Sequence, residues 1–426
     1  MNWYDGEPKG PQADPKRLKK EYDEWMETNH PDKIDALSDD DMKQLLEEEL
    51  AFSSAMSVEE YTLWHKWLEI HRKYPTKEVS TLFGTENVMV NPKDKHIIDK
   101  AKSMLWVPET TEDYLKLEPE LVSTDSNWLR EHYHTVRLFG STMRHNLNPG
   151  RNMYYLVIDK VTGKYLGVIC ITGDFLDLTP RDDYIGWTRE QRSKVDGPLL
   201  NSCIGSSIVP TQPLGHDYVG GKLLALLCLS DTVQEDWKRR YGQTLAGVTT
   251  TSLYGSYSQY NGLKYWHKRG KSKGSIVFEP TRENLYKVRD WTNKRDPVRY
   301  FELYVGKRDN GQMLKRDFKF RMLNWVYSQL KIKDTKTDHQ RGIYYSHLYE
   351  NTAEFLREEI PAEKLKKRFD TSTEHLVKLW KDKYATKRIN SLRDSDRVKN
   401  ETLFYDELIY LSWEETKAKY LQDVGR

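Results

Sequence analysis

Apolar positions recur at helical spacing through the first part of the chain. MKQLLEEELAFSSAM and VEEYTLWHKWLEIHRKY place apolar residues three and four positions apart, with charged residues between them. This spacing is typical of amphipathic helices. Proline-containing segments (VNPKDK and WVPETTEDYLKLEPEL) follow, and proline disfavours helix at the residue before it. The pattern predicts a helical, acidic accessory region over residues 1–110.

The pattern changes near Trp128, where helical and β-rich segments begin to alternate. NWLREHYHTVRLFGSTMRHN predicts a helix, and NMYYLVID and KYLGVICIT predict a hairpin around a Thr-Gly turn. The predicted order then continues with a strand (CIGSSIVP), a helix over 219–241, a strand (TLAGVTTTSLYG), a helix (SQYNGLKYWHKRG) and a strand (SIVFEP). This order is typical of an α/β (α+β) fold and predicts a core over residues 120–283.

The last part of the chain, residues 284–426, reads as mixed and then mainly helical. FELYVG is interpreted as one more strand and FRMLNWVYSQLKI as a helix, and residues 350–390 as helices rich in basic and aromatic residues. We expect a basic module here that either completes the cleft of the core or binds nucleic acid.

The composition says more about the cellular compartment of the protein than about its fold. The longest apolar run, Leu223–Leu229, is too short to span a bilayer, and the first residues lack the apolar core of a signal peptide. Three cysteines (Cys170, Cys203 and Cys228) lie far apart inside apolar stretches, which favours reduced core residues over disulfides. We expect a cytoplasmic protein without a membrane partner.

The formal net charge of +2 conceals an uneven distribution. The first 60 residues contain the acidic run DALSDDDMKQLLEEEL, whereas KYWHKRGKSKG, GKRDNGQMLKRDFKFR, EKLKKRF and KDKYATKR gather lysine and arginine after residue 263. Such runs fit either solvated helix faces or a surface for a polyanion. The tryptophans and tyrosines between them are the side chains that stack on bases, so DNA is an expected partner. Protein partners stay unknown.

The stretch PLGHDYVGGKLLALL, residues 213–227, raises the question of a phosphate site. A P-loop would require G-x-x-x-x-G-K-[ST], but here a second glycine precedes Lys222, and Leu223 replaces the hydroxyl residue. Nucleotide hydrolysis is therefore disfavoured. A glycine-rich turn between a strand and a helix still exposes backbone N–H groups to an anion. The glycines equally fit a close packing contact between helix and strand, and both interpretations stay open.

The order of strand, loop, helix, strand and helix resembles the GNAT acyltransferase fold. In that family a strand, a pyrophosphate loop and its helix bind the acyl carrier beside a V-shaped cleft. The resemblance implies a mixed central sheet and acyl-CoA or a related acyl donor, although the cofactor otherwise stays unknown. It implies that the donor is bound by Gln212, Gly215, Gly220, Gly221, Lys222 and Asn261. At the position of the family's tyrosine this chain has Trp266, with Tyr265 beside it.

Several short motifs in one order carry a second resemblance. IGWTREQR, IVPTQPLGH, GGKLLALL, DWKRRYG, TTSLYGSYSQYNGLKYW, KRGKSKG and QRGIYYSHLYENTAEFL are similar to phage proteins related to Mom, the GNAT-like DNA base-modification protein. They also resemble DruA-like proteins of the Druantia anti-phage system. The resemblance covers about residues 130–390. It implies either an acyltransferase-like enzyme that modifies a DNA base, as phages do to resist restriction, or a non-catalytic nucleic-acid-binding defence subunit. An acyltransferase for a protein or small molecule is a third possibility.

The candidate residues follow from these hypotheses. A flipped base needs aromatic walls and polar groups for its edge. The residues predicted to take part in proton transfer or to bind the substrate are Asp174, Asp183, His216, Ser252, Tyr254, Tyr265 and His267. The residues predicted to stack on bases are Tyr184, Trp187, Tyr254, Tyr257, Tyr260 and Trp266. The residues predicted to contact phosphates are Lys264, Lys268, Arg269, Lys271 and Lys273, with an extension through Lys366, Lys367, Arg368, Lys383, Lys387 and Arg388.

Each of these functional assignments has a structural alternative. Each aromatic residue alone also fits a core position, and His216 also fits a solvated loop. His132 and His134 stand two positions apart and point in different directions on a helix, while His339 and His347 flank a predicted turn. Because no HExxH or CxxC motif is present, the sequence predicts no metal site. The resemblance to Mom-like proteins leaves iron open.

Overall fold

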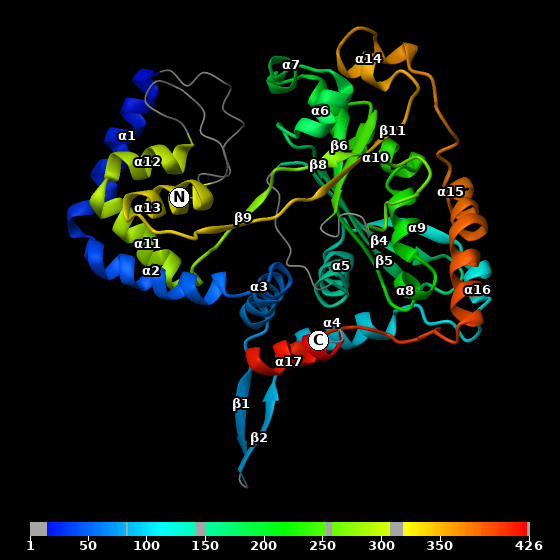
Figure 1. Cartoon of the computed structure of the whole chain (residues 1–426), viewed down its shortest axis with the longest axis horizontal. Helices are drawn as coiled ribbons and strands as arrows, with labels where there is room; N and C mark the ends of the chain where they lie inside the picture. The colour runs from blue at the N-terminus through cyan, green and yellow to red at the C-terminus, as the bar shows by residue number, and fades with distance from the viewer. Residues whose placement is uncertain (1–14, 82–83, 142–149, 253–257, 307–317, 424–426) are drawn as a thin grey trace. The chain divides into compact units, whose positions relative to one another are not determined.

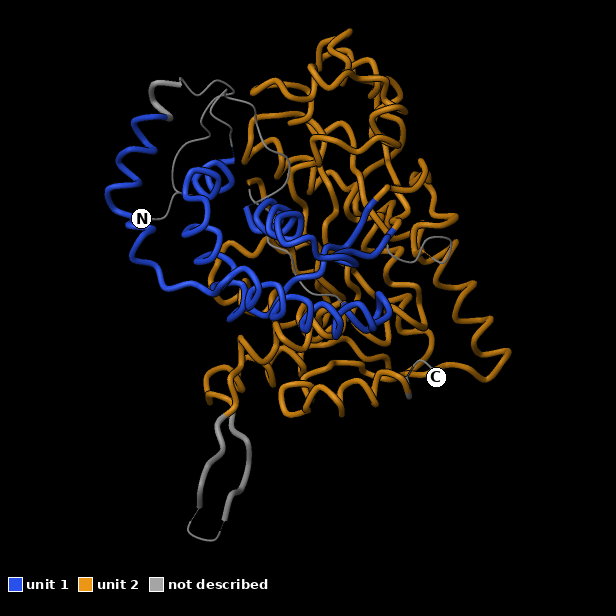
Figure 2. Tube along the Cα trace, turned by 60° about the vertical axis from the view of Figure 1, so that its left-hand side comes forward, with its two compact units in different colours: residues 1–61, 274–339 blue, residues 62–273, 340–426 orange. Residues whose placement is uncertain are grey.

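The computed structural model describes residues 15–81, 84–141, 150–252, 258–306 and 318–423. The chain forms two compact units (Figure 2). Unit 1 combines residues 1–61 with 274–339, and unit 2 combines residues 62–273 with 340–426. The boundaries of these units differ from those of the three predicted ranges, because residues 274–339 belong to the same unit as the N-terminal helices.

Unit 1 is mainly helical (Figure 1). Its elements are α1 (Pro15–Asn29), η2 (Pro31–Lys33), α2 (Asp39–Ser54), β9 (Ser275–Val277), α11 (Arg282–Arg295), α12 (Pro297–Val305), α13 (Phe318–Gln329) and β10 (Lys336–Asp338). Met42, Leu46 and Leu50 lie on one face of α2, as their spacing predicts, and pack in one core with Trp291 and Val326.

One prediction for this unit was wrong, and a second was right about a strand but wrong about the sheet to which it belongs. FELYVG is not a strand, because α12 has an N-cap at Asp296, whose carboxylate accepts from the Arg299 N–H, and Pro297 at its first position. These are strong helix-start signals. Strand β9 of the SIVFEP segment pairs with β10 in a two-stranded sheet and not with the core sheet.

Unit 2 is built around a seven-stranded sheet with the order β3-β4-β5-β6-β7-β11-β8. Its strands are β3 (Pro119–Ser123), β4 (Asn152–Asp159), β5 (Tyr165–Gly173), β6 (Ser202–Pro210), β7 (Gly247–Ser252), β8 (His267–Lys271) and β11 (Gly342–His347). Strands β6 and β7 are parallel, and the other neighbouring strands are antiparallel. The predicted mixed α/β fold is therefore confirmed at this level.

Alternating side chains of the sheet belong to two separate cores. Met153 and Tyr155 of β4 point into one core, and Leu156 into the other. The first face is covered by α9 (Gly220–Leu227), α10 (Asp231–Tyr241), α15 (Thr373–Trp380) and α16 (Thr386–Asp394). The second face is covered by α4 (Pro92–Ser103) and α5 (Asn127–Phe139) (Figure 1).

Shorter elements complete the unit. They are α6 (Thr179–Ile185), α7 (Arg189–Ser193), α8 (Leu214–Asp217), α14 (Thr352–Leu356), α17 (Trp413–Asp423), η3 (Asp113–Lys116), η4 (Pro198–Asn201), η6 (Ala362–Lys364), η7 (Lys381–Ala385), η8 (Asp406–Ile409) and the hairpin β1 (Lys77–Thr81)–β2 (Gly84–Met89). Helix α3 (Val58–Lys73) contributes residues to both units. Within the described ranges, no helix has the length and apolar character needed to cross a membrane.

Three further element predictions need correction. The helix predicted over 219–241 is two helices, because Ser230 accepts from the Val233 N–H and starts α10. The predicted helix SQYNGLKYWHKRG consists, from residue 258 on, of turns followed by β8. The predicted turn QRGIYYSH contains β11, which lies between β7 and β8. The last two errors concern adjacent strands, so the edge of the sheet was missed as a whole.

Candidate functional site

The sheet of unit 2 opens between β6 and β7. These strands pair only over Ser202–Gly205 and Gly247–Thr250, after which β6 continues along β5. Gln259 lies between them, with its Nε2 3.4 Å from the Ile208 carbonyl and 3.0 Å from the Tyr260 hydroxyl. The Tyr260 hydroxyl in turn lies 3.4 Å from the Thr250 hydroxyl. Among the described residues, the chain's own side chains therefore occupy the position of the predicted cleft.

The loop before α9 uses most of its backbone N–H groups internally. The N–H groups of residues 215–218 all have acceptors within the loop. Gln212 supplies one of these acceptors, because its Oε1 accepts from the His216 N–H at 2.8 Å. The first turn of α9, at Gly220 and Gly221, is the part that remains for an external anion.

That first turn is covered by neighbouring side chains. Gly220 and Gly221 are both buried. A Cβ atom on Gly220 would lie 2.7 Å from Cγ of Leu214, and one on Gly221 would overlap Oε1 of Gln259. The glycines thus allow close packing of the loop and the following turn against α9. Of the two interpretations left open by the sequence, this geometry supports the packing one.

Lys222 faces backbone carbonyls. Its Nζ donates to the carbonyls of Gln259 and Asn261 at 2.8 and 2.7 Å, and burial lowers the pKa of this amine. The Asn261 side chain accepts from the Tyr344 hydroxyl at 2.5 Å. Three of the residues that the GNAT resemblance assigned to an acyl donor, Gln212, Lys222 and Asn261, are thus bound to other parts of the chain. They do not fit the phosphates of an acyl carrier in this arrangement.

Asp174 belongs to a buried ionic network. Its carboxylate lies 2.5 Å from Nη1 of Arg181 and accepts from the hydroxyls of Ser202 and Thr249 at 2.5 and 2.8 Å. The side chains of Asp174 and Arg181 are both fully buried. Arg181 also pairs with Asp182 at 2.6 Å. This arrangement satisfies the carboxylate and gives Asp174 the contacts of a structural residue.

The other residues predicted for proton transfer lie in different places. His216 pairs with Asp217 through a contact of 2.7 Å between Nδ1 and Oδ1. Tyr265 stacks on Phe369, with 3.7 Å between ring centroids. Ser252 is buried at the end of β7. The structure does not bring these residues together around one space, and Asp183 is exposed on α6. Tyr254 lies outside the described residues.

The predicted base-stacking residues separate into buried and exposed members. Trp187, Tyr260 and Trp266 belong to hydrophobic cores, and Trp187 donates to Asp182 at 3.0 Å. Their rings present no open face to a base, so their placement gives a stacking role no support. Tyr184 is 40% exposed. Tyr257, like Tyr254, lies outside the described residues.

The basic residues of β8 do lie together on an edge of the sheet. Strand β8 is the last strand beside β11, and Lys268 and Lys271 are exposed there. Residues 366–368 run beside 348–350, which directly follow β11. We define the β8 strip as the cations at both places, namely Lys268, Arg269, Lys271, Lys273, Lys366, Lys367 and Arg368. In the described part of the chain, none of these cations forms an ion pair with a carboxylate. Lys194 and Lys378, in contrast, each have one.

At one end of the strip, five side chains form a compact cluster. The Arg269 guanidinium lies 3.3 Å from the ring centroid of Tyr184, whose hydroxyl is 3.4 Å from Nδ1 of His347. His347 and His267 have nearly parallel rings with centroids 5.9 Å apart. Arg368 Nη2 lies 3.0 Å from Nε2 of His267. We call these residues the Arg–His cluster.

Electrostatics keeps both histidines uncharged near neutral pH. Burial, reinforced by Arg368, lowers the pKa of His347 to about 4. Burial and the same arginine also lower the pKa of His267. Because a guanidinium only donates hydrogen bonds, Nε2 of His267 accepts from Arg368. The cluster therefore has two permanent positive charges, on Arg269 and Arg368, beside two neutral imidazoles.

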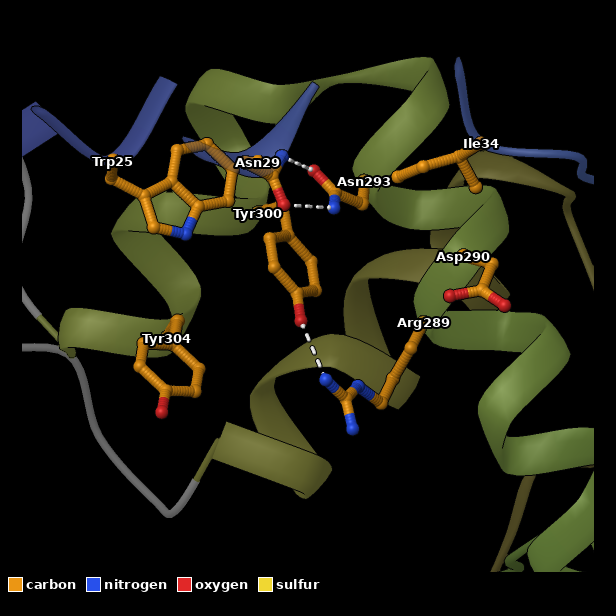
Figure 3. Close-up of a pocket in the computed structure, with 8 residues that line it drawn as sticks. All are labelled: Trp25, Asn29, Ile34, Arg289, Asp290, Asn293, Tyr300 and Tyr304. Atoms are coloured by element: carbon orange, nitrogen blue, oxygen red, sulfur yellow. Dashed lines mark hydrogen bonds between the residues drawn. The ribbon is translucent and has the colours of Figure 1, made fainter. Parts of the chain in front are cut away.

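Unit 1 contains a separate pocket of about 360 Å³ (Figure 3). Its lining residues are Trp25, Asn29, Ile34, Arg289, Asp290, Asn293, Tyr300 and Tyr304. Asn29 and Asn293 bind each other through two amide hydrogen bonds of 2.7 and 2.8 Å, and Arg289 donates to Tyr300 at 3.3 Å. Several polar groups of this pocket are thus already paired with one another. No metal-binding group of three or more His, Cys, Asp or Glu side chains occurs among the residues that the structure describes.

Comparison with known proteins places the chain in a family. A family model described as "Druantia protein DruA" matches residues 71–358, which is more than half of the chain. The chain belongs to the DruA family. A relative, the Druantia protein DruA of Escherichia coli (strain UMEA 4076-1), is 28% identical over 227 residues. The aligned part covers 49% of this chain and 54% of that protein, so the chain spans about half the length of this relative. No solved structure matches.

The DruA match confirms one part of the resemblance seen in the sequence. The relation to Mom-like proteins is not shown, and neither is a GNAT-specific core. For this DruA-family chain, the matched range includes β6, the glycine loop, β8 and β11, whereas Arg368 lies beyond it.

Each member of the Arg–His cluster can be singled out in the sequence, but the sequence alone does not bring these residues together. It predicts a turn at His347 and a helix at His267. In the structure they lie on neighbouring antiparallel strands, with His267 opposite Tyr345 and His347 two residues further along. Only the pairing of β11 with β8 brings them side by side. A signal for strand β11 was present in Ile343, Tyr344 and Tyr345, because β-branched and aromatic residues are enriched in strands.

Proposed function

We propose that this chain is a DNA-binding component of an anti-phage defence system of the Druantia type. The observation that carries the proposal is the β8 strip, where seven cations gather and form no ion pair with any carboxylate that the structure describes. Membership of the DruA family supports the defence context. DNA phosphates are the natural partners of an unneutralised basic surface, since each contact releases condensed counterions.

The nature of the strip supports a binding role beyond protection of a sheet edge. Lysines on edge strands also prevent unwanted pairing between sheets. That role does not require arginines, nor cations on a second segment such as 366–368. Arg269 stacks on the exposed Tyr184, and this arrangement holds the guanidinium in a fixed orientation. A preorganised arginine next to exposed lysines is typical of surfaces that contact nucleic-acid backbones.

A binding role has more support than base modification. The strand–loop–helix–strand order around β6 and β7 is compatible with a GNAT-like ancestry. However, Lys222 and Asn261 are bound to other parts of the chain, and Gln259 fills the space beside Gly221. The comparisons likewise favour the defence interpretation over the Mom-like one. We therefore propose that the loop has a structural role and that function resides on the β8 strip.

Fluorescence anisotropy with a labelled DNA duplex at several salt concentrations tests this proposal. We expect measurable binding that weakens steeply with salt. The double variant Lys268→Gln/Lys271→Gln should bind every DNA sequence more weakly and lower the slope of log K against log salt by about 2, close to one unit for each lost phosphate contact. A control, Lys93→Gln/Lys100→Gln, removes the same charge from exposed positions on α4.

The control should retain most of the affinity and the slope. Equal losses in both double variants would mean that net charge alone drives binding, and the β8 strip would lose its assigned role. Absence of binding to any DNA at low salt would contradict the proposal outright. The defence context is tested by phage plating on cells that express the chain with the other components of a Druantia system. Variants without DNA binding should lose protection.

A further inference from the structure

The Arg–His cluster differs from the rest of the β8 strip in its geometry. Lys268 and Lys271 are exposed side chains on an edge strand. Arg269, Arg368, His267, His347 and Tyr184, in contrast, contact one another through a chain of ring and hydrogen-bond contacts. Four elements contribute to it, namely α6, β8, β11 and the segment after η6, and their backbone positions fix these side chains. The cluster is therefore preorganised.

The charge of the cluster is not neutralised by the protein. Arg269 and Arg368 each carry a positive charge, and no carboxylate forms an ion pair with either in the described ranges. The groups that face the two histidines are cationic or neutral, namely Arg269, Arg368 and Tyr184. Partly buried cations without an anion are costly to maintain, so this site favours an anionic ligand.

Hydrogen-bond donors in the cluster also lack partners. The buried Nε of Arg269 has no hydrogen-bond partner among the described residues. A guanidinium that stacks on a ring keeps its N–H groups in the ring-parallel plane. The two Nη groups of Arg269 form no hydrogen bond with any residue that the structure describes, and together they match the oxygens of a tetrahedral anion. The Tyr184 hydroxyl and the imidazole N–H groups add donors beside it. Several donors and two charges thus meet at one place.

We propose that the Arg–His cluster binds a phosphate dianion, as carried by the terminal phosphomonoester of a nucleic-acid strand. This inference rests on the proposed DNA binding, because the cluster is part of the β8 strip. Two fixed positive charges match the charge of a monoester, which is nearly −2 at neutral pH, better than the single charge of an internal phosphodiester. The remaining lysines of the strip then contact the backbone that leads to this end. The same chemistry would accept free phosphate.

The test compares two versions of one hairpin DNA that differ only in a 5′-phosphate or a 5′-hydroxyl end. We expect the wild-type protein to bind the phosphorylated hairpin about tenfold more tightly. Arg269→Lys keeps the charge but loses the planar fork, so the ratio should approach one while the salt slope stays unchanged. Arg368→Gln should abolish the ratio too. Thermal unfolding of both variants verifies that they fold.

Lys271→Gln is the matched control, since it lies on the same strand outside the cluster. It should weaken both hairpins alike and keep the ratio. If the wild-type protein binds both hairpins equally, the monoester site is refuted while DNA binding stands. If Lys271→Gln and Arg269→Lys reduce the ratio equally, the cluster has no special role, and the inference is overturned.

Inorganic phosphate separates failure of this inference from failure of DNA binding. Titration of phosphate into the full chain, followed by NMR of the imidazole C–H signals, should shift His267 and His347 and leave exposed His96 in place. Saturable shifts without any DNA binding would show a site for a small phosphate compound and contradict the nucleic-acid source. Absence of shifts, together with equal hairpin affinities, would overturn the site itself.

Discussion

Asp174 and Arg269 differ in the one respect that decides their chemistry, which is the presence of partners. The Asp174 side chain is fully buried and has three partners, Arg181, Ser202 and Thr249. Its charge is therefore already stabilised inside the protein. Arg269 stacks on a tyrosine ring and forms no ion pair with a carboxylate among the described residues. From the sequence both were equally plausible site residues, because burial and pairing are not visible in residue types. Pairing makes Asp174 structural and leaves Arg269 available for an anion.

At the residue scale, His347 should make stability depend on pH. In the folded protein burial, Arg368, His267 and Arg269 lower its pKa from the ordinary value of 6.5 to about 4. Between these values the unfolded chain binds more protons than the folded one, so the free energy of unfolding should fall as the pH drops from 6.5 to about 4. Above pH 6.5 the imidazole is neutral in both states, so His347 causes no loss of stability there.

Urea unfolding at a series of pH values measures this effect. His347→Asn should flatten the loss of stability in the acid range, whereas His96→Asn on the exposed face of α4 should leave the profile unchanged. An unchanged profile in His347→Asn would mean that other groups cause the acid sensitivity.

At the scale of elements, the sequence predicted segments whose signals are local. The hairpin of β4 and β5, the strands β6 and β7, and helix α13 follow from alternation or helical spacing. Strand β8 could not be predicted in this way, because HKRGK contains no apolar residue and its strand structure depends on pairing with β11. FELYVG failed for the opposite reason, since its apolar residues suit a strand while the flanking Asp296, Pro297 and Gly306 favour a helix. Pairing partners that are distant in sequence explain most of what could not be predicted.

Gly221 allows the close approach of α9 to the turn after β7, and this contact is testable. Gly221→Ala introduces a Cβ that overlaps the side chain of Gln259. Gln259 would have to move and lose its hydrogen bond to Tyr260. We expect the free energy of unfolding to fall by about 1–3 kcal/mol, as for other overpacked sites.

Gly173→Ala is a suitable control for this change, because the nearest atom to its new Cβ, in Arg151, is 3.9 Å away. Chemical unfolding of both variants should show a loss in Gly221→Ala alone. Unchanged stability in Gly221→Ala, combined with lost ligand binding, would restore the anion interpretation of the loop.

At the scale of the whole molecule, the β8 strip and the Arg–His cluster are formed by unit 2, and unit 1 has a core of its own. Trp291 is buried in that core and donates to Asp39. Trp291→Ala should destabilise unit 1 by about 3–5 kcal/mol. Below the temperature at which unit 1 unfolds, the affinity of the chain for DNA should stay unchanged, as measured by anisotropy.

Trp380→Ala removes a buried tryptophan from a core of unit 2 and serves as the comparison. This variant should lose both stability and DNA affinity as the temperature rises. A loss of affinity in Trp291→Ala under conditions where its unit 1 remains folded would show that DNA binding depends on unit 1 as well.

The composition of unit 1 from two distant parts of the chain has a consequence for biosynthesis. Met42, Leu46 and Leu50 of α2 share a core with α11 and α13, yet Arg282 follows Ser54 by about 230 positions. At a translation rate of roughly 5–20 residues per second, α2 leaves the ribosome about 10–50 seconds before α11 exists. Throughout that interval its apolar face lacks its native partners on α11 and α13, and only N-terminal residues of the same core, such as Trp25 and Tyr61, are available on the nascent polypeptide. Chaperones that hold exposed apolar helices should therefore meet this protein early in its synthesis.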